Sequence, residues 1–311
     1  MTREPLTTEL VAVLVALLGE EPQVLTVGAD GAAESGPSDA TAMPPALPSG
    51  PLQASHRSLQ SGLRAWVEAQ TGRNPGYVEQ LYTFADVDRA GANGRILSVS
   101  YLGLTAIGDN PNGWRHWYEF FPWEDRRDGR GQDAHEALAR RLRDWAAEDP
   151  ARSAVRWQRC AIGFGLEGHG WSPELCLQRY ELLYESGLLP ESARRSGPPV
   201  PGLRLRYDHR RILATGLARL RAKIQYRPVV FELMPAVFTL GQLQGAVEAL
   251  AGRRVHKQNF RRLVEQQDLV EDTGERTTDT GGRPAKMVRF RREVHLERQA
   301  AGTKLPIPRS R

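Results

Sequence analysis

The chain has 311 residues, of which 40% are hydrophobic and 25% charged, which is enough for two domains with packed cores. The longest apolar run, Leu10–Leu18, is too short to span a bilayer and lacks the basic flank and cleavage site of a signal peptide. Cys160 and Cys176 are too few for a disulfide framework and predict two buried thiols in a cytoplasmic protein with no membrane partner.

The charge is divided unevenly along the chain. Residues 1–200 hold 19 basic and 26 acidic residues, whereas residues 201–311 hold 23 basic and 11 acidic ones. The segment Ser196–Pro201 (SGPPVP) lies between the two parts and predicts a domain boundary. We therefore expect domains at 1–200 and 201–311, the second one suited to a polyanion.

The first part begins with two predicted strands of a hairpin, Leu10–Leu18 and Val24–Val27, the first of them central and buried. Residues 28–50 are rich in Ala, Gly, Ser and Pro and predict a mobile surface loop. A helix at Leu59–Thr71 and strands at Tyr77–Phe84 and Arg95–Leu104 follow. This order predicts an α/β fold of the α+β sandwich type.

Aromatic residues crowd into Asn112–Asp125, a pattern more typical of a core or a subunit interface than of a ligand platform. Helices are predicted at Ala134–Ala147, Ser172–Gly187 and His209–Gln225, the last of which is rich in arginine. We expect a homodimer, with Trp114–Trp123 and Asp208–Gln225 offering apolar surface for the contact.

The last part reads as helix, turn, basic helix, strand, loop and strand. Thr239 and Gln242 have the spacing of a capping box, and Gly252 ends that helix. A second helix at His256–Gln267 precedes an apolar step, a glycine-rich basic loop at Glu271–Lys286 and a strand at Met287–Phe290. This plan is typical of a winged helix-turn-helix that binds double-stranded DNA. The alternative is a small helical cap with a solvated charged face.

The second helix carries the residues predicted to contact DNA. Phe260, Leu263 and Val264 form its core face. Basic and amide side chains on the other face are expected at base edges or adjacent phosphates: Lys257, Gln258, Asn259 and Arg261. Phosphate contacts are expected from Arg262 and from three residues of the wing, Arg276, Arg283 and Lys286. His256 stands where an Asp or Ser cap is usual, which predicts a weaker helix start.

Several segments resemble one family. They include EQLYTF (79–84), ILSVSYLGL (96–104), FFPWED (120–125), RYELLYESGL (179–188), DHRRIL (208–213), FELMPAVFTLGQLQ (231–244), KQNFRR (257–262) and GRPAKMVRF (282–290). Together they resemble the Nudix-related transcriptional regulators of the NrtR and NadQ group. The resemblance implies a Nudix-like effector domain fused to a C-terminal winged helix. It also implies repression of NAD synthesis or salvage genes, and an effector that is an adenine nucleotide or NAD-related metabolite such as ATP, NAD or ADP-ribose.

A working Nudix hydrolase carries paired glutamates on one helix, where they hold Mg²⁺ or Mn²⁺. When the signature is aligned to end at Gly72, Ala69 and Gln70 replace that pair and Arg57 replaces the upstream glutamate. A shift of one residue recovers only Arg64 and Glu68. We therefore expect a Nudix-like domain that binds its ligand without catalytic residues, metal or cofactor.

The candidate effector residues are Tyr82, Phe84, Arg95 and Tyr101, each of which has an ordinary strand role as its alternative. Two other functions compete with the regulator. One is a Nudix-type nucleoside-diphosphate hydrolase with a divergent metal site. The other is an RNA-binding or scaffold protein, which the chain supports less well because it lacks the exposed aromatic strand of an RNA recognition motif.

Overall fold

A computed structural model describes residues 6–28, 43–85, 90–91, 94–108, 110–128, 131–194, 197–278 and 284–291. The chain forms two compact units that interleave along the sequence. One consists of residues 1–16, 23–120 and 203–216, and the other of 17–22, 121–202 and 217–311. These units do not coincide with domains at 1–200 and 201–311, which stay a prediction. In the part of the chain described, no helix is long and apolar enough to cross a membrane.

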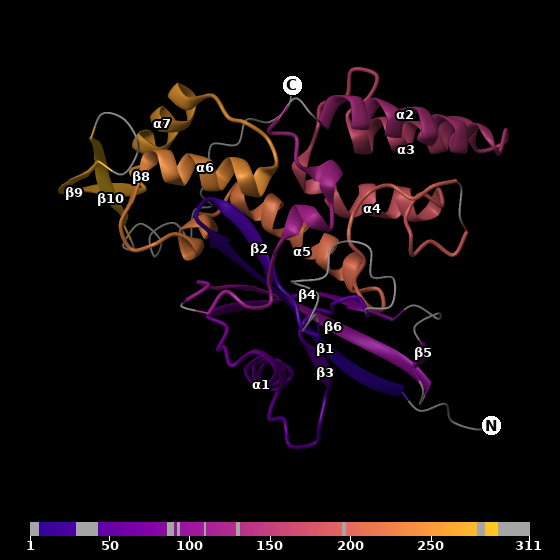
Figure 1. The fold of residues 1–311 in the computed structure, drawn as a ribbon, viewed down its shortest axis with the longest axis horizontal. Coiled ribbons are helices and arrows are strands. Elements are labelled where there is room, and N and C mark those ends of the chain that lie inside the picture. Colours follow the sequence, from indigo (N-terminus) through magenta and orange to yellow (C-terminus); the bar gives the residue numbers. More distant parts are fainter. Residues whose placement is uncertain are drawn as a thin grey trace. The chain divides into compact units, whose positions relative to one another are not determined.

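The first unit is built on a mixed sheet with the strand order β4-β6-β1-β2-β7, to which β3 adds by pairing with β1 and β5 by pairing with β6 (Figure 1). β1 runs parallel to β6 and antiparallel to β3. The strands are β1 (Leu6–Leu18), β2 (Glu21–Leu25), β3 (Ser49–Pro51), β4 (Tyr77–Phe84), β5 (Ala90–Gly91), β6 (Gly94–Leu104) and β7 (Trp114–His116). The predicted strands at 77–84 and 95–104 are confirmed.

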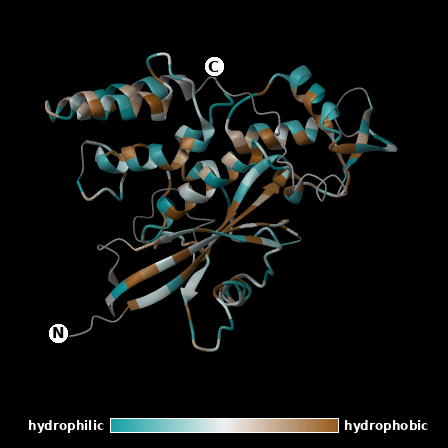
Figure 2. Cartoon of the chain, turned by 180° about the vertical axis from the view of Figure 1, so that it is seen from behind, coloured by the Kyte–Doolittle hydropathy of each residue, from teal (hydrophilic) through white to brown (hydrophobic). Residues whose placement is uncertain are grey.

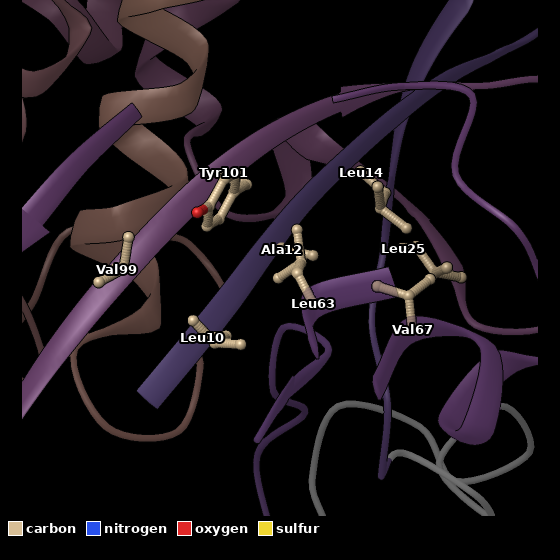
Figure 3. Packing of buried hydrophobic residues seen from close by; sticks show 8 residues of the cluster. All are labelled: Leu10, Ala12, Leu14, Leu25, Leu63, Val67, Val99 and Tyr101. Carbon is tan, nitrogen blue, oxygen red and sulfur yellow. The ribbon is translucent and has the colours of Figure 1, made fainter. Parts of the chain in front are cut away.

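β1 is apolar on both faces because both faces are covered. On one face, Leu10, Ala12 and Leu14 form a core with Leu63 and Val67 of helix α1 (Leu59–Thr71), to which neighbouring strands add further residues (Figure 3). On the other face, Val13 meets helix α5 (His209–Ile224) at Gly216, where an added Cβ would lie 2.8 Å from the valine. Helix α5 can therefore approach the sheet only with glycine at this position.

The loop predicted at residues 28–50 is packed over its last part. Val27 and Ala46 exchange backbone hydrogen bonds of 2.8 and 2.9 Å. The Leu47 side chain is fully buried, and its backbone N–H donates to Nδ1 of His209 at 3.0 Å. Residues 43–50 are therefore a fixed edge of the sheet, which corrects the expectation of a mobile loop; residues 29–42 lie outside the described part.

The second unit contains three helices before α5: α2 (Gly131–Ala147), α3 (Ser153–Phe164) and α4 (Cys176–Glu185). Helix α3 is not predicted from the sequence, because its apolar residues do not mark one face: Val155 is 62% exposed while Cys160 and Phe164 are buried. Cys160 and Cys176 are buried free thiols, as predicted. Burial raises the pKa of Cys160 to about 11, which leaves it unreactive at neutral pH.

A fully buried ion cluster holds this unit together. Arg179 of α4 donates to both carboxylate oxygens of Glu124 at 2.6 and 2.7 Å, and Arg221 of α5 donates to the same carboxylate. Burial by itself raises the pKa of Glu124, but the two guanidinium groups outweigh it and hold that pKa below its usual range. The cluster therefore links the segment Pro122–Glu124 (the 3-10 turn η2) with α4 and α5.

The C-terminal part of this unit has the plan predicted from the sequence. A 3-10 turn η4 (Val229–Leu233) and a short strand β8 (Phe238–Thr239) lead into helices α6 (Leu240–Ala251) and α7 (Lys257–Gln266). The strands β9 (Val270–Thr277) and β10 (Ala285–Phe290) follow, in a three-stranded sheet of order β8-β10-β9. The described elements are those of a winged helix-turn-helix.

The two segments expected to form a dimer interface are buried within the single chain. Trp117, Phe120 and Phe121 are fully buried, and a further 3-10 turn, η1 (Trp117–Glu119), lies in the same aromatic segment. Helix α5 buries its apolar side chains in the same way, at Ile212, Leu213, Leu217, Leu220 and Ile224. These apolar side chains are therefore not available as surface, and both the homodimer and the segments that form its interface stay predictions.

Candidate nucleic-acid interface

Helix α6 begins and ends as its sequence predicts. The Thr239 hydroxyl accepts from the backbone N–H of Gln242 at 3.1 Å, and the Gln242 side chain accepts from the N–H of Thr239 at 2.8 Å. This reciprocal capping box satisfies two of the four N–H groups left open at a helix start. Gly252 ends α6 in the left-handed conformation, with a φ of 69°.

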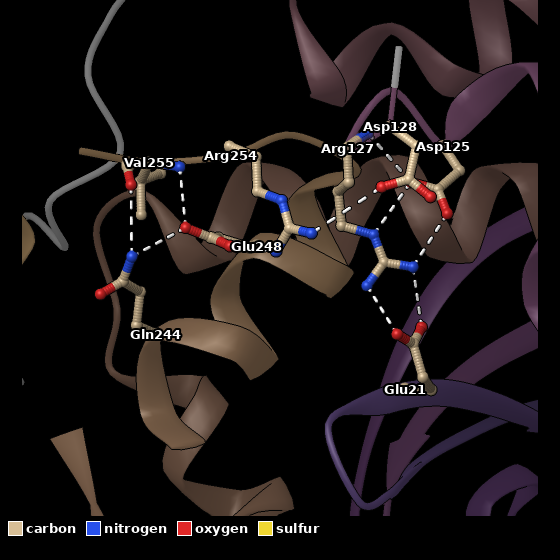
Figure 4. A network of polar contacts seen from close by, with 8 residues as sticks. All are labelled: Glu21, Asp125, Arg127, Asp128, Gln244, Glu248, Arg254 and Val255. Carbon is tan, nitrogen blue, oxygen red and sulfur yellow. Dashed lines mark hydrogen bonds and ion pairs between the residues drawn. The ribbon is translucent and has the colours of Figure 1, made fainter. Parts of the chain in front are cut away.

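The turn between α6 and α7 is held by a buried carboxylate, Glu248 (Figure 4). It accepts from the backbone N–H of Val255 at 3.0 Å, and from the side chains of Gln244 at 2.8 Å and Arg254 at 2.9 Å. Burial raises the pKa of Glu248, but these hydrogen bonds outweigh that effect and lower it. The start of α7 is thus fixed by an anion that the sequence analysis did not single out.

Helix α7 has one apolar face and one free polar face. Phe260 and Val264 are buried and Leu263 is half-buried, as predicted. The candidate DNA contacts of this helix, Lys257, Gln258, Asn259, Arg261 and Arg262, are all exposed. Within the described residues, none of these five side chains makes a hydrogen bond or ion pair. Figure 2 colours the helix as largely hydrophilic. The face is therefore a set of donors, acceptors and charges without intramolecular partners.

The start of α7 lacks a side-chain cap, as His256 predicts. His256 has an extended conformation, with φ −69° and ψ 119°, and makes no capping hydrogen bond through its side chain. Uncapped backbone N–H groups at a helix start favour an anion such as a phosphate. Lys257, at the first position of the helix, adds a positive charge at the same end.

The strands of the wing are longer than predicted, and two of its basic side chains are paired with carboxylates. The loop predicted from Glu271 is in fact strand β9 as far as Thr277, because the segment pairs in register with β10. Lys286 is paired with Asp272 at 3.1 Å, and Arg289 with Glu271. Arg276 is exposed on β9, opposite Lys286. The predicted phosphate contact Arg283 lies outside the described residues.

The candidate effector residues do not form one cluster. Tyr82 is 59% exposed and its ring lies 5.0 Å from that of Phe84, which is buried. Arg95 is exposed and donates to the backbone carbonyl of Ala85, at the end of β4. Tyr101 is only 5% exposed and belongs to the core between the sheet and α1. Phe84 and Tyr101 are therefore both buried packing residues, and effector contact by any of the four stays a prediction.

The side chains of α1 at the positions aligned with the Nudix signature make contacts within the fold. The Gln70 amide donates to the Ser49 carbonyl at 2.7 Å and accepts from the Ser49 N–H at 3.1 Å. Trp66 donates through Nε1 to the carbonyl of Pro51 at 2.9 Å. Arg64 donates to the carbonyl of Gly76 at 2.9 Å. These side chains attach α1 to strand β3 and to the turn before β4.

Residues 230–290 match the family of NrtR DNA-binding winged helix domains. A curated protein of Acinetobacter baylyi, the "ADPR responsive transcriptional repressor NtrR", is 38% identical over 88 residues, which are 28% of this chain. The match spans 35% of the length of that relative.

Solved structures share the fold over most of the chain. The structure of Shewanella oneidensis NrtR with a 27mer DNA is 21% identical, with a TM-score of 0.52, and the match covers 93% of this chain and 95% of that one. A MutT/nudix family protein of Enterococcus faecalis is 15% identical, with a TM-score of 0.52 over 94% of this chain and 88% of the other. Together with the winged-helix match, they support the resemblance found in the sequence: the chain has the fold of a Nudix-like domain joined to a winged helix, and residues 230–290 match the NrtR winged-helix family.

Proposed function

We propose that the chain is a DNA-binding transcriptional repressor that reads its operator through helix α7. One observation carries the proposal: five exposed side chains, Lys257, Gln258, Asn259, Arg261 and Arg262, have no partner within the described chain. They lie on the second helix of a domain that matches DNA-binding winged helices. A second helix in this position enters the major groove, where arginine, asparagine and glutamine side chains distinguish bases.

The Nudix-like domain, in this proposal, binds an effector without hydrolysing it. The contacts of Gln70 and Trp66 with strand β3 support this, because they commit the helix face to the fold. The name of the Acinetobacter relative supports ADP-ribose as the first effector to test, with NAD and ATP as alternatives. Tyr82 and Arg95, the two exposed candidates, are the proposed contacts, and genes of NAD synthesis or salvage are the proposed targets.

The test begins with selection of duplexes from a random DNA pool by the full-length protein. The selected duplex and a scrambled duplex are then titrated with wild type and with the double variant Lys257→Ala/Arg261→Ala. The control is Arg143→Ala/Arg159→Ala, which removes two exposed arginines from α2 and α3 and so matches the charge change. We expect only the α7 variant to lose its preference for the selected duplex.

The effector is tested by repeating the titration with ADP-ribose, NAD and ATP. We expect one of them to change the affinity for the selected duplex, because a ligand that binds the DNA-competent and incompetent states unequally shifts their populations. Equal losses of preference in the α7 and control variants would reject the proposed reading helix. Turnover of ADP-ribose with Mg²⁺ at ordinary enzyme rates would reject the non-hydrolytic role and favour the hydrolase.

A further inference from the structure

A small pocket in the second unit has no role in the proposed function. Its walls are mainly apolar, and it is lined by Pro122, Trp123, Asp125, Arg126, His135, Leu138, Val200 and Pro201. Its volume is about 110 Å³. An engineered apolar cavity of about 150 Å³ admits benzene, so this pocket matches a molecule built on a single ring or a similar apolar body.

One cation in this pocket lacks an anion. The Arg126 guanidinium is half-buried and lies 4.6 Å from the ring centroid of Trp171. Among the described residues it donates no hydrogen bond and forms no ion pair. Burial and the neighbouring charge of Arg179 lower the pKa of Arg126, and the charge of Glu124 offsets them only in part. An unpaired cation in such surroundings is costly, and a bound carboxylate would relieve the cost through charge-assisted hydrogen bonds.

The other polar groups of the pocket leave this positive charge uncompensated. The Asp125 carboxylate is already paired with Arg127, which donates to it at 2.8 and 2.9 Å. Burial, with Arg126 and Arg179, lowers the pKa of His135 to about 4, so its imidazole is neutral at pH 7. The nearby Glu124 already binds two arginines, Arg179 and Arg221. The local excess of positive charge therefore selects an anion.

We propose that this pocket binds a small monocarboxylate with an apolar, ring-sized body. Its carboxylate meets the Arg126 guanidinium, and its body lies against Trp123, Leu138 and Val200. None of these residues belongs to the proposed DNA contacts or to the proposed contacts of the nucleotide effector. The site is thus a second ligand site on the same chain.

The pocket borders the turn of the helix-turn-helix. The backbone N–H of Arg126 donates to the carbonyl of Gly252, the C-cap residue directly after α6, at 2.7 Å. Two residues on, Asp128 pairs with Arg254 at 3.8 Å (Figure 4). A ligand that fixes Arg126 therefore fixes a segment bonded to the start of the turn before α7. The consequence for DNA binding rests on the proposed function, whereas the ligand site does not.

The first experiment measures binding of benzoate to the full-length protein by calorimetry, without DNA. Acetate keeps the charge without the ring, and benzyl alcohol keeps the ring without the charge. We expect one benzoate per chain, with both comparison compounds weaker by about tenfold or more. Arg126→Gln should weaken benzoate by a similar factor. The matched control Arg143→Gln, whose guanidinium also stacks on a tryptophan, Trp157 at 4.0 Å, should bind benzoate as wild type does.

Three further measurements separate a ligand site from a structural role of Arg126 and test its link to the turn. Thermal unfolding of Arg126→Gln should occur at the wild-type temperature or above it, because the substitution removes an unpaired charge. Val200→Phe, which fills the pocket, should abolish benzoate binding. Hydrogen exchange with benzoate should show protection of residues 122–128 and 250–256.

Benzoate that binds wild type and Arg126→Gln equally, or does not bind wild type at millimolar concentration, overturns the site. Binding without protection of 250–256 overturns its link to the turn. Because no DNA is present, failure of the proposed repressor function leaves each of these results unchanged.

Discussion

Charged side chains in and around the winged helix form two groups, one buried and paired and the other exposed and without partners in the described structure. The carboxylates of Glu124 and Glu248 are buried, and arginines, the Gln244 amide and the Val255 N–H bind them. On the free face of α7, by contrast, Arg261 and its neighbours are exposed and make no intramolecular contact in the described structure. The first arrangement fixes a shape and the second displays charge, so substitutions in the two regions should affect different measurements.

The largest effect is expected at the buried cluster. Glu124→Gln removes the anion between Arg179 and Arg221 and leaves two buried cations uncompensated. We expect the free energy of unfolding to fall by about 3–5 kcal/mol, measured by denaturant titration. Glu185→Gln, which breaks the exposed pair with Arg159, should change it by about 1 kcal/mol or less. Equal small effects of the two variants would show that burial does not distinguish these carboxylates.

A smaller loss of stability is expected at the turn. Glu248→Ala removes the acceptor of the Val255 N–H and should cost about 1–3 kcal/mol. Because the folded pKa of Glu248 is lowered, its stabilisation is present above the unfolded value of about 4.3 and is lost as pH falls through the folded value. The difference between wild type and variant should therefore shrink in acid. A difference that is the same at pH 3 and pH 7 would contradict the role of the ionised carboxylate. Glu265→Ala, exposed on α7, is the control.

On the displayed face, the effect should be on binding alone. If Arg261 makes a bidentate base contact, Arg261→Ala should weaken the selected duplex by about 1–3 kcal/mol and relax preference at one position. The free energy of unfolding should stay within about 0.5 kcal/mol of wild type, since the side chain has no partner in the described chain. Arg289→Ala, an arginine paired with Glu271 in the wing, is the matched control for charge. A loss of stability in Arg261→Ala would instead show that this side chain contributes to the fold.

The smallest effect, a change in DNA affinity, is expected in the wing, where Lys286 is both exposed and paired. Lys286 is exposed and also paired with Asp272, so Lys286→Ala should weaken all duplexes equally and by less than about 1 kcal/mol. Asp272→Asn should strengthen binding to all duplexes, because it releases the lysine and removes an anion that repels phosphate. Salt titrations measure both, and a phosphate contact by Lys286 should appear as a salt slope smaller by about one unit in Lys286→Ala. An unchanged slope would assign Lys286 to the fold alone.

Local sequence signals predicted the elements well wherever one residue decides a boundary. The capping box of Thr239 and Gln242 sets the start of α6, and Gly252 sets its end. The spacing of these residues was therefore enough to predict the helix. Helix α1 and strand β4 have the predicted limits for similar reasons.

Interactions between distant residues could not be predicted in this way. Arg179 and Glu124 are 55 positions apart, and no periodicity marks them as partners. Tyr101 fits a ligand cleft as well as a core by its chemistry, and only the packing of α1 against the sheet decides between them. The free face of α7 was predictable because it follows from helical spacing and lacks tertiary contacts.

The backbone hydrogen bond from Arg126 to Gly252 limits how far the protein can be truncated with this contact intact. A fragment limited to residues 230–290, the extent of the family match, would lose the donors to two carbonyls at the end of α6: Arg126 for Gly252 and Arg221 for Leu250. The winged helix recognisable as a sequence module therefore depends on residues outside that module for two of its backbone hydrogen bonds. An excised piece that keeps both donors would have to begin at or before Arg126, in the segment 121–202 of the second compact unit.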